Sequence, residues 1–158
     1  MHSNRTLLYL DDLAVGDTFI TGERAVTAEE IVSFAADYDP QIFHLDAEAA
    51  KETFFGGLAA SGWHTAAITM GLLVRSGIPL ADGLIGAGGD LSWPTATRPG
   101  DTLHVESVIE SIVPSRSRPD RGMVTLRSET KTSDGEVRQL FTVKMVVFRL
   151  TPKGPQPV

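Results

Sequence analysis

The chain has 158 residues, of which 42% are hydrophobic and 22% charged, so it can form one compact domain with a sizeable core, whereas two would be cramped. Its formal net charge of −6 argues against broad binding to nucleic acids or anionic membranes. Because the chain has no cysteine, thiol nucleophiles, disulfides and thiolate metal sites are excluded. We expect a cytoplasmic protein, since residues 1–5 lack a signal-peptide pattern and the apolar run 66–74 is too short to cross a bilayer.

The first part of the chain predicts a short strand over residues 17–24 and then an amphipathic helix. Thr27 is a candidate N-cap with Glu30 three residues later, which is the pattern of a capping box. Four apolar or aromatic residues then fall on one helical face: Ile31, Phe34, Ala35 and Tyr38. Pro40 disfavours helical geometry at the residue before it and ends the helix there.

Two further helices are predicted before the middle of the chain. Asp46 is the expected N-cap of a helix that continues to Glu52. After a glycine-containing loop over residues 54–61, a third helix runs from Gly62 to about Arg75. Apolar residues lie all around this helix, so we expect it to be buried on nearly all sides.

From Gly83 onward the hydrophobic pattern changes to period two, which is typical of strands. Long strands are expected over residues 102–113, 123–132 and 136–150, with Asp134-Gly135 as a hairpin turn. Other turns are predicted at Pro99-Gly100-Asp101 and over residues 114–122. Hairpin-linked strands form an antiparallel sheet, and such a sheet curved around the apolar helix is the α+β arrangement called the hot dog fold. We expect one such domain with a core over residues 16–150 and a flexible tail over 151–158.

The segment from Tyr38 to His44 holds the first candidate for chemistry. Asp39 and His44 lie five positions apart on backbone expected to be irregular, between two helices. A carboxylate and an imidazole together can take and return a proton near neutral pH. Each residue also has a structural interpretation, because Asp39 could cap a turn that begins at Pro40 and His44 could be satisfied by backbone groups.

The start of the apolar helix is the second candidate. Ser61 or Gly62 begins this helix, and its first amides have no acceptor within the helix. Amides at a buried helix N-terminus stabilise developing negative charge, and a glycine lets a ligand approach the backbone closely. A plain helix start that packs against the sheet is equally compatible with this sequence. His64, two residues into the helix, is expected to be a packed or capping histidine.

Together these residues resemble the MaoC-like dehydratases, hot dog fold enzymes that include the (R)-specific enoyl-CoA hydratases. The family's usual core reads Gly-Asp-x-Asn-Pro-x-His, and Asp39 and His44 match it at the same spacing. Tyr38, Gln41 and Ile42 stand where that core has Gly, Asn and Pro. The resemblance covers residues 16–150 and includes these further segments: Gly56-Gly57, Ala60-Ser61-Gly62-Trp63, Asp90-Leu91-Ser92-Trp93 and Arg98-Pro99-Gly100-Asp101.

The resemblance implies reversible addition of water to a trans-2-enoyl thioester, with coenzyme A (CoA) or acyl carrier protein as the carrier and no cofactor. It implies that Asp39 and His44 bind and activate the water and that Gln41 orients them. The Gly62 amide is the expected donor to the thioester oxygen, with Ser61 in the same substrate-binding site. It also implies a homodimer or higher homo-oligomer. A hot dog thioesterase and a non-catalytic acyl-CoA-binding subunit are the alternatives.

Three arginines in one predicted turn are candidates for contact with the CoA phosphates: Arg116, Arg118 and Arg121. A solvated charged hairpin is an equally good interpretation of the same residues. No two histidines have the spacing of metal ligands on a helix, so we expect no metal site.

Overall fold

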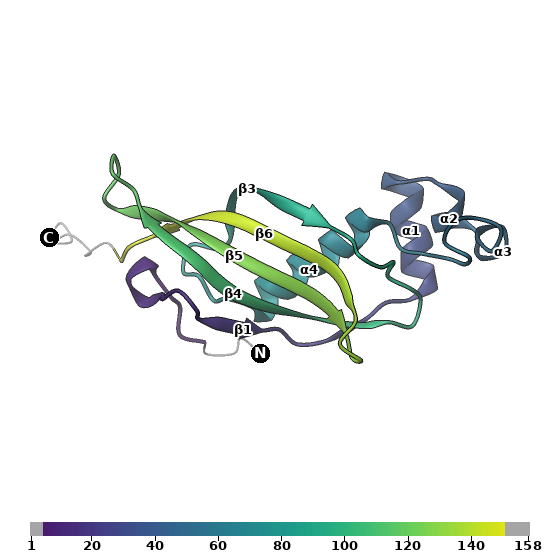
Figure 1. Cartoon of the computed structure of the whole chain (residues 1–158), viewed down its shortest axis with the longest axis horizontal. Coiled ribbons are helices and arrows are strands. Elements are labelled where there is room, and N and C mark those ends of the chain that lie inside the picture. Colours follow the sequence, from purple (N-terminus) through teal and green to yellow (C-terminus); the bar gives the residue numbers. More distant parts are fainter. Residues whose placement is uncertain (1–4, 151–158) are drawn as a thin grey trace, which may run out of the picture.

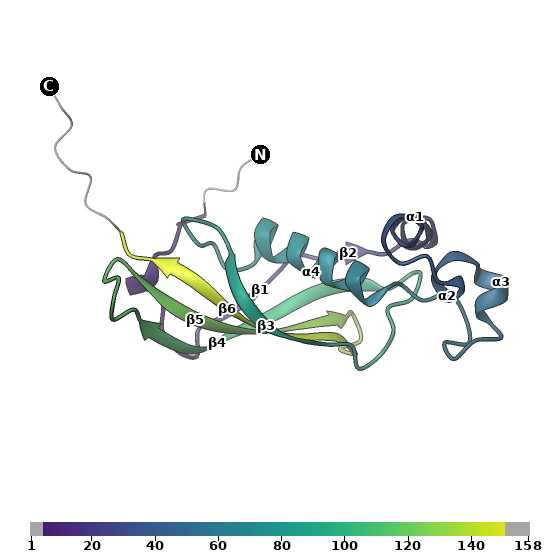
Figure 2. The same ribbon diagram turned by 90° about the horizontal axis from the view of Figure 1, so that it is seen from above.

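The computed structural model describes residues 5–150, and the expected tail over 151–158 lies outside them. A six-stranded antiparallel sheet curves along one face of a long helix, while the shorter helices gather at one end (Figures 1 and 2). The elements in chain order are η1 (Leu10–Asp12), β1 (Thr18–Ile20), β2 (Arg24–Ala25), α1 (Ala28–Tyr38), α2 (Ile42–Leu45), α3 (Ala47–Ala50), α4 (Gly62–Ser76), β3 (Ile85–Ser92), β4 (Thr102–Pro114), β5 (Arg121–Thr132) and β6 (Val137–Phe148). This arrangement is the expected hot dog fold.

The sheet has the strand order β1-β4-β5-β6-β3, and β2 also pairs with β4. Along β5 every second residue is buried, as expected for a strand with one face against a core. The core between the sheet and α4 includes Leu72 and Leu73 of the helix and Leu103 and Val105 of β4. A second cluster lies toward the other end of the sheet and joins Leu10 and Ile78 to β4, β5 and β6. The helix and the sheet therefore stabilise each other by burying apolar area.

The elements with the strongest local signals were predicted correctly. Thr27 caps α1 by accepting a hydrogen bond from the Glu30 amide at 3.2 Å. The Asp101 amide donates to the Arg98 carbonyl at 3.1 Å, which closes the expected turn. The predicted hairpin is confirmed as well, with Gly135 at φ +86° between β5 and β6. These signals succeed because each one involves residues that are close in sequence.

Three local predictions were wrong. The strand expected over residues 17–24 is two short strands, β1 and β2, separated where the Thr21 hydroxyl accepts a hydrogen bond from the Val105 amide at 2.9 Å. The Glu30 side chain does not complete a capping box, because its Oε2 pairs with Arg24 Nη2 at 3.0 Å. His44 lies in the four-residue helix α2 and not on irregular backbone. In the first two cases a contact with a more distant residue decides the structure, and in the third the helix is too short to be recognised from the sequence.

The predicted boundaries of α4 are confirmed, but the prediction that it is buried on nearly all sides was wrong. One side packs on the sheet, and the other side exposes Trp63 (61%), Met70 (40%) and Val74 (62%). Figure 2 shows α4 against one face of the sheet, with no other element on its far side. No helix within residues 5–150 is long and apolar enough to span a membrane.

Candidate active site

Asp39 and His44, the first pair singled out in the sequence, lie side by side. Asp39 is the C-cap of α1, and after Pro40 the chain enters α2, which carries His44. His44 Nε2 is 3.2 Å from Asp39 Oδ2. The side chains of His44 and Asp39 are 5% and 17% exposed, respectively. The break between α1 and α2 therefore brings a carboxylate and an imidazole together in a largely buried place.

Two further side chains donate hydrogen bonds to the Asp39 carboxylate, one to each of its oxygens. The Ser61 hydroxyl donates to Oδ2 at 2.7 Å, and the Gln41 side-chain amide donates to Oδ1 at 2.6 Å. Burial raises the pKa of Asp39, but the hydrogen bonds from Ser61 and Gln41 and the nearby His44 lower it by more, so its pKa lies below the ordinary value of 3.8. Asp39 is therefore ionised at neutral pH. Ser61 and Gln41 both contact the Asp39 carboxylate.

A backbone carbonyl fixes which nitrogen of His44 carries the proton. His44 Nδ1 is 2.6 Å from the Ala59 carbonyl oxygen. A carbonyl only accepts hydrogen bonds, so Nδ1 must be the donor. A ring that is protonated on both nitrogens donates from Nε2 to Asp39 Oδ2, and this charged form is the one that lowers the Asp39 pKa, whereas the neutral ring presents an Nε2 lone pair on the same side. A water molecule or hydroxyl group next to this pair can donate to Nε2 and to the carboxylate, which makes the pair a natural site for water.

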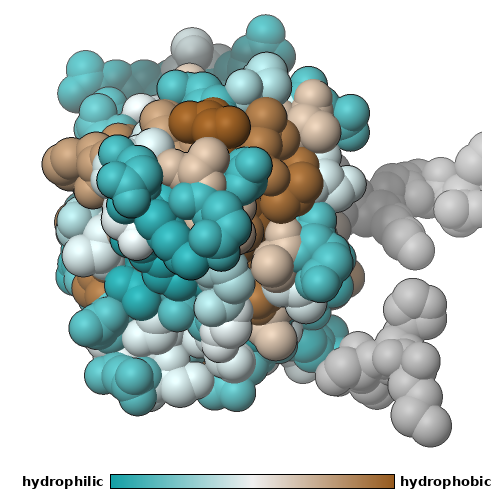
Figure 3. All heavy atoms as spheres, turned by 90° about the vertical axis from the view of Figure 1, so that its right-hand side faces the viewer, coloured by the Kyte–Doolittle hydropathy of each residue, from teal (hydrophilic) through white to brown (hydrophobic). Residues whose placement is uncertain are grey.

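A mainly apolar cavity of about 360 Å³ lies beside the pair. His44 and Gly62 both line it, and so do four aromatic rings, those of Phe43, Phe54, Phe55 and Trp93. Figure 3 views the end of the molecule that carries α1, α2 and α3 and shows hydrophobic residues gathered beside hydrophilic ones. Such a cavity can hold an apolar chain next to His44, whereas Asp39 and Ser61 do not line it.

The start of α4 also faces this cavity. Ser61 is the fully buried N-cap, and Gly62 is the first helical residue. A side chain at position 62 would place its Cβ 2.6 Å from the Trp93 ring, so glycine is needed here for the packing of Trp93. Trp93 is held in turn, because its Nε1 donates to Gln139 Oε1 at 2.9 Å. The sequence offered only one indication of this tryptophan, its place in the family-like segment at residues 90–93.

The arginines predicted to contact the CoA phosphates do not join this site within one chain. They belong to the β4–β5 turn and the first residue of β5, and Figure 1 shows that turn at the opposite end of the sheet from α1, α2 and α3. Arg121 pairs with Asp120 at 2.9 Å, and its guanidinium lies 4.6 Å from the centre of the Phe148 ring.

His64 is a packed histidine, as the sequence suggested. Its ring is 5% exposed and stacks on Phe34 with 4.6 Å between ring centres. Burial lowers the pKa of His64, and the nearby Glu30 carboxylate partly opposes this effect. Within the described residues, Nδ1 of His64 and Oε1 of Glu30 are the buried side-chain polar atoms that lack a hydrogen-bond partner. His64 does not line the cavity beside His44.

The sequence matches the pattern of one protein family, the MaoC like domain, over residues 12–132. It is 31% identical over 141 residues to the uncharacterized protein YdeM of Bacillus subtilis, covering 84% of this chain and 97% of YdeM. It is 28% identical over 133 residues to a 3-hydroxybutyryl-CoA dehydratase of Methylorubrum extorquens, covering 82% of each protein. The crystal structure of a MaoC-like dehydratase from Rhodospirillum rubrum is similar with a TM-score of 0.91 and 61% identity, covering 92% of this chain and 99% of that one.

Proposed function

The chain belongs to the family of MaoC-like domains, and on this premise we propose that it adds water reversibly to the double bond of a trans-2-enoyl thioester carried by CoA or by acyl carrier protein. The product is a 3-hydroxyacyl thioester, and the reverse reaction is a dehydration. The observation that carries the proposal is the Asp39–His44 pair at 3.2 Å, with its ionised carboxylate and its Nδ1-protonated ring, beside an apolar cavity. The similarity to a 3-hydroxybutyryl-CoA dehydratase supports the same reaction class.

The proposed chemistry balances with one water molecule. The water lies against Asp39 Oδ2 and His44 Nε2, and its oxygen attacks C3 of the enoyl group. The pair accepts one proton from the water as the C3–O bond forms and returns it to C2 as the enolate collapses. Such positioned acid–base groups contribute typically about 10²- to 10⁴-fold to a rate. The hydroxyl ends on C3, the proton ends on C2, and no other reactant is needed.

The negative charge that develops on the thioester oxygen needs a hydrogen-bond donor. We assign this role to the Gly62 amide, because Gly62 lines the cavity and first-turn amides have no acceptor within the helix. The Trp93 ring over Gly62 then forms one wall of the site for the thioester.

Crotonyl-CoA is a suitable test substrate, because hydration removes the absorbance of its enoyl group. We expect Asp39→Asn and His44→Ala to lower the hydration rate by about 10²-fold or more while the proteins stay folded. Asp37→Asn, on the exposed side of the same helix, and His104→Ala, on β4, are matched controls and should keep the wild-type rate. Full activity in either dyad variant contradicts the proposal, and release of free CoA thiol at the rate of substrate loss identifies a thioesterase instead.

We also propose that the active form is a homodimer. The exposed residues Trp63, Met70 and Val74 form an apolar stripe on α4, and β3 is an edge strand of the sheet. A second copy of the chain would cover the stripe and could extend the sheet at β3. Sedimentation at micromolar concentration should show a dimer for the wild type and a monomer for Met70→Glu, whereas a monomeric wild type contradicts this part of the proposal.

A further inference from the structure

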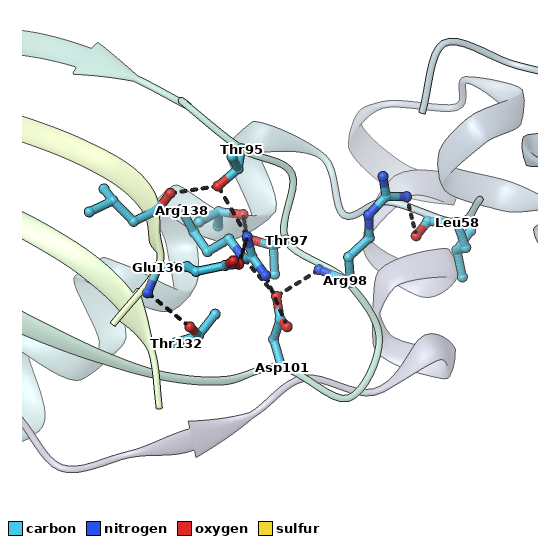
Figure 4. A network of polar contacts seen from close by, with 10 residues as sticks. Leu58, Thr95, Thr97, Arg98, Asp101, Thr132, Glu136 and Arg138 are labelled. Carbon is cyan, nitrogen blue, oxygen red and sulfur yellow. Dashed lines mark hydrogen bonds and ion pairs between the residues drawn. The ribbon is translucent and has the colours of Figure 1, made fainter. Parts of the chain in front are cut away.

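The guanidinium group of Arg98 donates hydrogen bonds to backbone carbonyls. Its Nη2 donates to the Phe55 carbonyl at 2.6 Å, and its Nη1 donates to the carbonyls of Gly57 at 3.0 Å and Leu58 at 3.3 Å. No ion pair of its guanidinium is found within residues 5–150, so these three carbonyls are its partners. Figure 4 shows the Arg98 side chain pointing at Leu58, away from the acidic residues nearby. One side chain therefore holds a stretch of loop that lies about forty residues earlier in the chain.

The stretch held by Arg98 leads directly to the carbonyl that orients His44. Ala59 follows Leu58, and its carbonyl oxygen accepts the Nδ1–H of His44 at 2.6 Å. The Ala59 amide donates to the Phe43 carbonyl at 3.0 Å, and the next amide, of Ala60, donates to the Thr97 carbonyl at 2.9 Å. Residues 55–60 are thus bound on one side to residues 97–98 and on the other side to α2.

Arg98 is itself firmly placed. Asp101 Oδ2 accepts a hydrogen bond from the Arg98 amide at 2.9 Å and another from Arg138 Nε at 2.9 Å. Gly100, at φ +87°, allows the tight turn that brings Asp101 back to Arg98. Figure 4 shows Asp101 between Arg98 and Arg138. Because Arg138 is the second residue of β6, the clamp on the loop is anchored at the start of that strand.

The loop needs such a clamp, because residues 51–60 contain no helix or strand to satisfy their carbonyls. Without Arg98, the carbonyls of Phe55, Gly57 and Leu58 would lose these hydrogen bonds, and, apart from its contact with His44, Ala59 would be held only by the hydrogen bonds of its own amide and of the Ala60 amide. A displacement of about 1 Å in a supporting group can cost about 100-fold in rate. Loss of the Ala59 contact would also let His44 carry its proton on Nε2, the nitrogen that the proposed reaction needs as an acceptor.

We propose that Arg98 is a positioning residue that fixes the Nδ1-protonated form of His44 through the backbone of residues 55–59. Its effect on rate rests on the proposed hydratase function, but its effect on the His44 ring does not. A purely structural role for Arg98 would lower the melting temperature and leave the proton on His44 Nδ1. An NMR spectrum of the His44 ring nitrogens therefore distinguishes a positioning role from a purely structural one.

The direct experiment is nitrogen NMR of the protein with ¹⁵N-labelled histidine, at a pH well above the ordinary histidine pKa of about 6.5. The His44 signals are identified by their loss in His44→Ala. We expect a protonated Nδ1 and an unprotonated Nε2 in the wild type, and signals averaged between the two neutral forms in Arg98→Ala. If the alanine variant does not fold, the same spectra are recorded for Arg98→Lys, which keeps the positive charge but loses the planar guanidinium group. Arg127→Ala, on the outer face of β5, is the matched control.

Kinetics with crotonyl-CoA supply the second measurement. We expect Arg98→Ala to lower kcat by about 100-fold with KM little changed, and added guanidinium ion to restore part of the activity. Wild-type His44 signals in the folded Arg98 variants overturn the proposal. If the wild type hydrates no enoyl thioester but the His44 signals change as expected, the positioning role stands and the proposed function fails.

Discussion

Removing the Ser61 hydroxyl tests whether the Asp39 carboxylate is stabilised in the way the structure indicates. Ser61 is fully buried and donates to Asp39 Oδ2 at 2.7 Å. Ser61→Ala deletes this donor and leaves the 17% exposed carboxylate with the hydrogen bond from Gln41 and the nearby His44. Because the Ser61 hydrogen bond lowers the pKa of Asp39, the variant should have a higher Asp39 pKa than the wild type.

The magnitude follows from the kind of hydrogen bond that is lost. A hydrogen bond to a charged group contributes about 1.5–3 kcal/mol to stability, whereas one between neutral groups contributes about 1 kcal/mol. For a chain of this size, a loss of about 2 kcal/mol lowers the melting temperature by roughly 4–8 °C. The matched control is Ser107→Ala, since the Ser107 and Ser128 hydroxyls form a buried neutral pair at 2.8 Å. Ser107→Ala should have the smaller effect on stability.

Thermal unfolding as a function of pH decides between a charged and a neutral contribution. The folded-state pKa of Asp39 is lowered, so its stabilisation is fully present above the ordinary value of 3.8 and is lost as the pH falls through the lower folded-state value. The difference in melting temperature between wild type and Ser61→Ala should therefore shrink in acid, while the effect of Ser107→Ala stays constant. An effect of Ser61→Ala that is equal at neutral and acid pH, or no larger than that of Ser107→Ala, would refute the reasoning.

Two other variants test the packing around the site. Gly62→Ala would place Cβ 2.6 Å from the Trp93 ring, so it should lower the free energy of unfolding by about 1–3 kcal/mol and shift the fluorescence emission of Trp93. The emission is measured in a Trp63→Phe background, where Trp93 is the only tryptophan. Unchanged emission would contradict this packing. Because burial lowers the pKa of His64 below 6.5, the unfolded chain takes up this proton first and the wild type should lose stability as the pH falls below that value. His64→Phe should flatten that slope in urea unfolding, with His104→Phe as the control, and an unchanged slope would show that His64 does not cause it.

The elements that the sequence predicted best are those whose signals are local. Thr27, Pro40 and the Asp134-Gly135 turn act within a few residues, and the structure has the expected boundaries there. The exposure of α4 was mispredicted because hydrophobicity shows that a face avoids water but not what covers it. No separate range was predicted for the edge strand β3, because the glycines in it have no side chains that could show the alternation of a strand.

The candidate site shows the same division. The spacing of Asp39 and His44, with Pro40 between them, is visible in the sequence alone and predicts the pair that the fold brings together. The hydrogen bonds that set its protonation could not be predicted, because Ala59 and Ser61 reach the pair across 15 and 22 residues of chain. The Arg98 contacts span 40 to 43 residues and are made to backbone carbonyls. Every residue has such a carbonyl, so the sequence does not indicate which ones Arg98 binds.

The N-terminus of α4 lies close to both negative charges of the proposed reaction, the one on the Asp39 carboxylate and the one that develops on the thioester oxygen. Ser61, the N-cap of α4, donates to the Asp39 carboxylate, and Gly62, the next residue, lines the cavity where its amide is the proposed donor. The positive end of the helix dipole therefore acts on the carboxylate before the reaction and on the thioester oxygen during it. As the pair takes a proton from water, its negative charge falls while that of the thioester oxygen rises by the same amount. The total charge near this helix end stays constant, so the proposed step moves charge between two places that are already stabilised and needs no rearrangement of the protein.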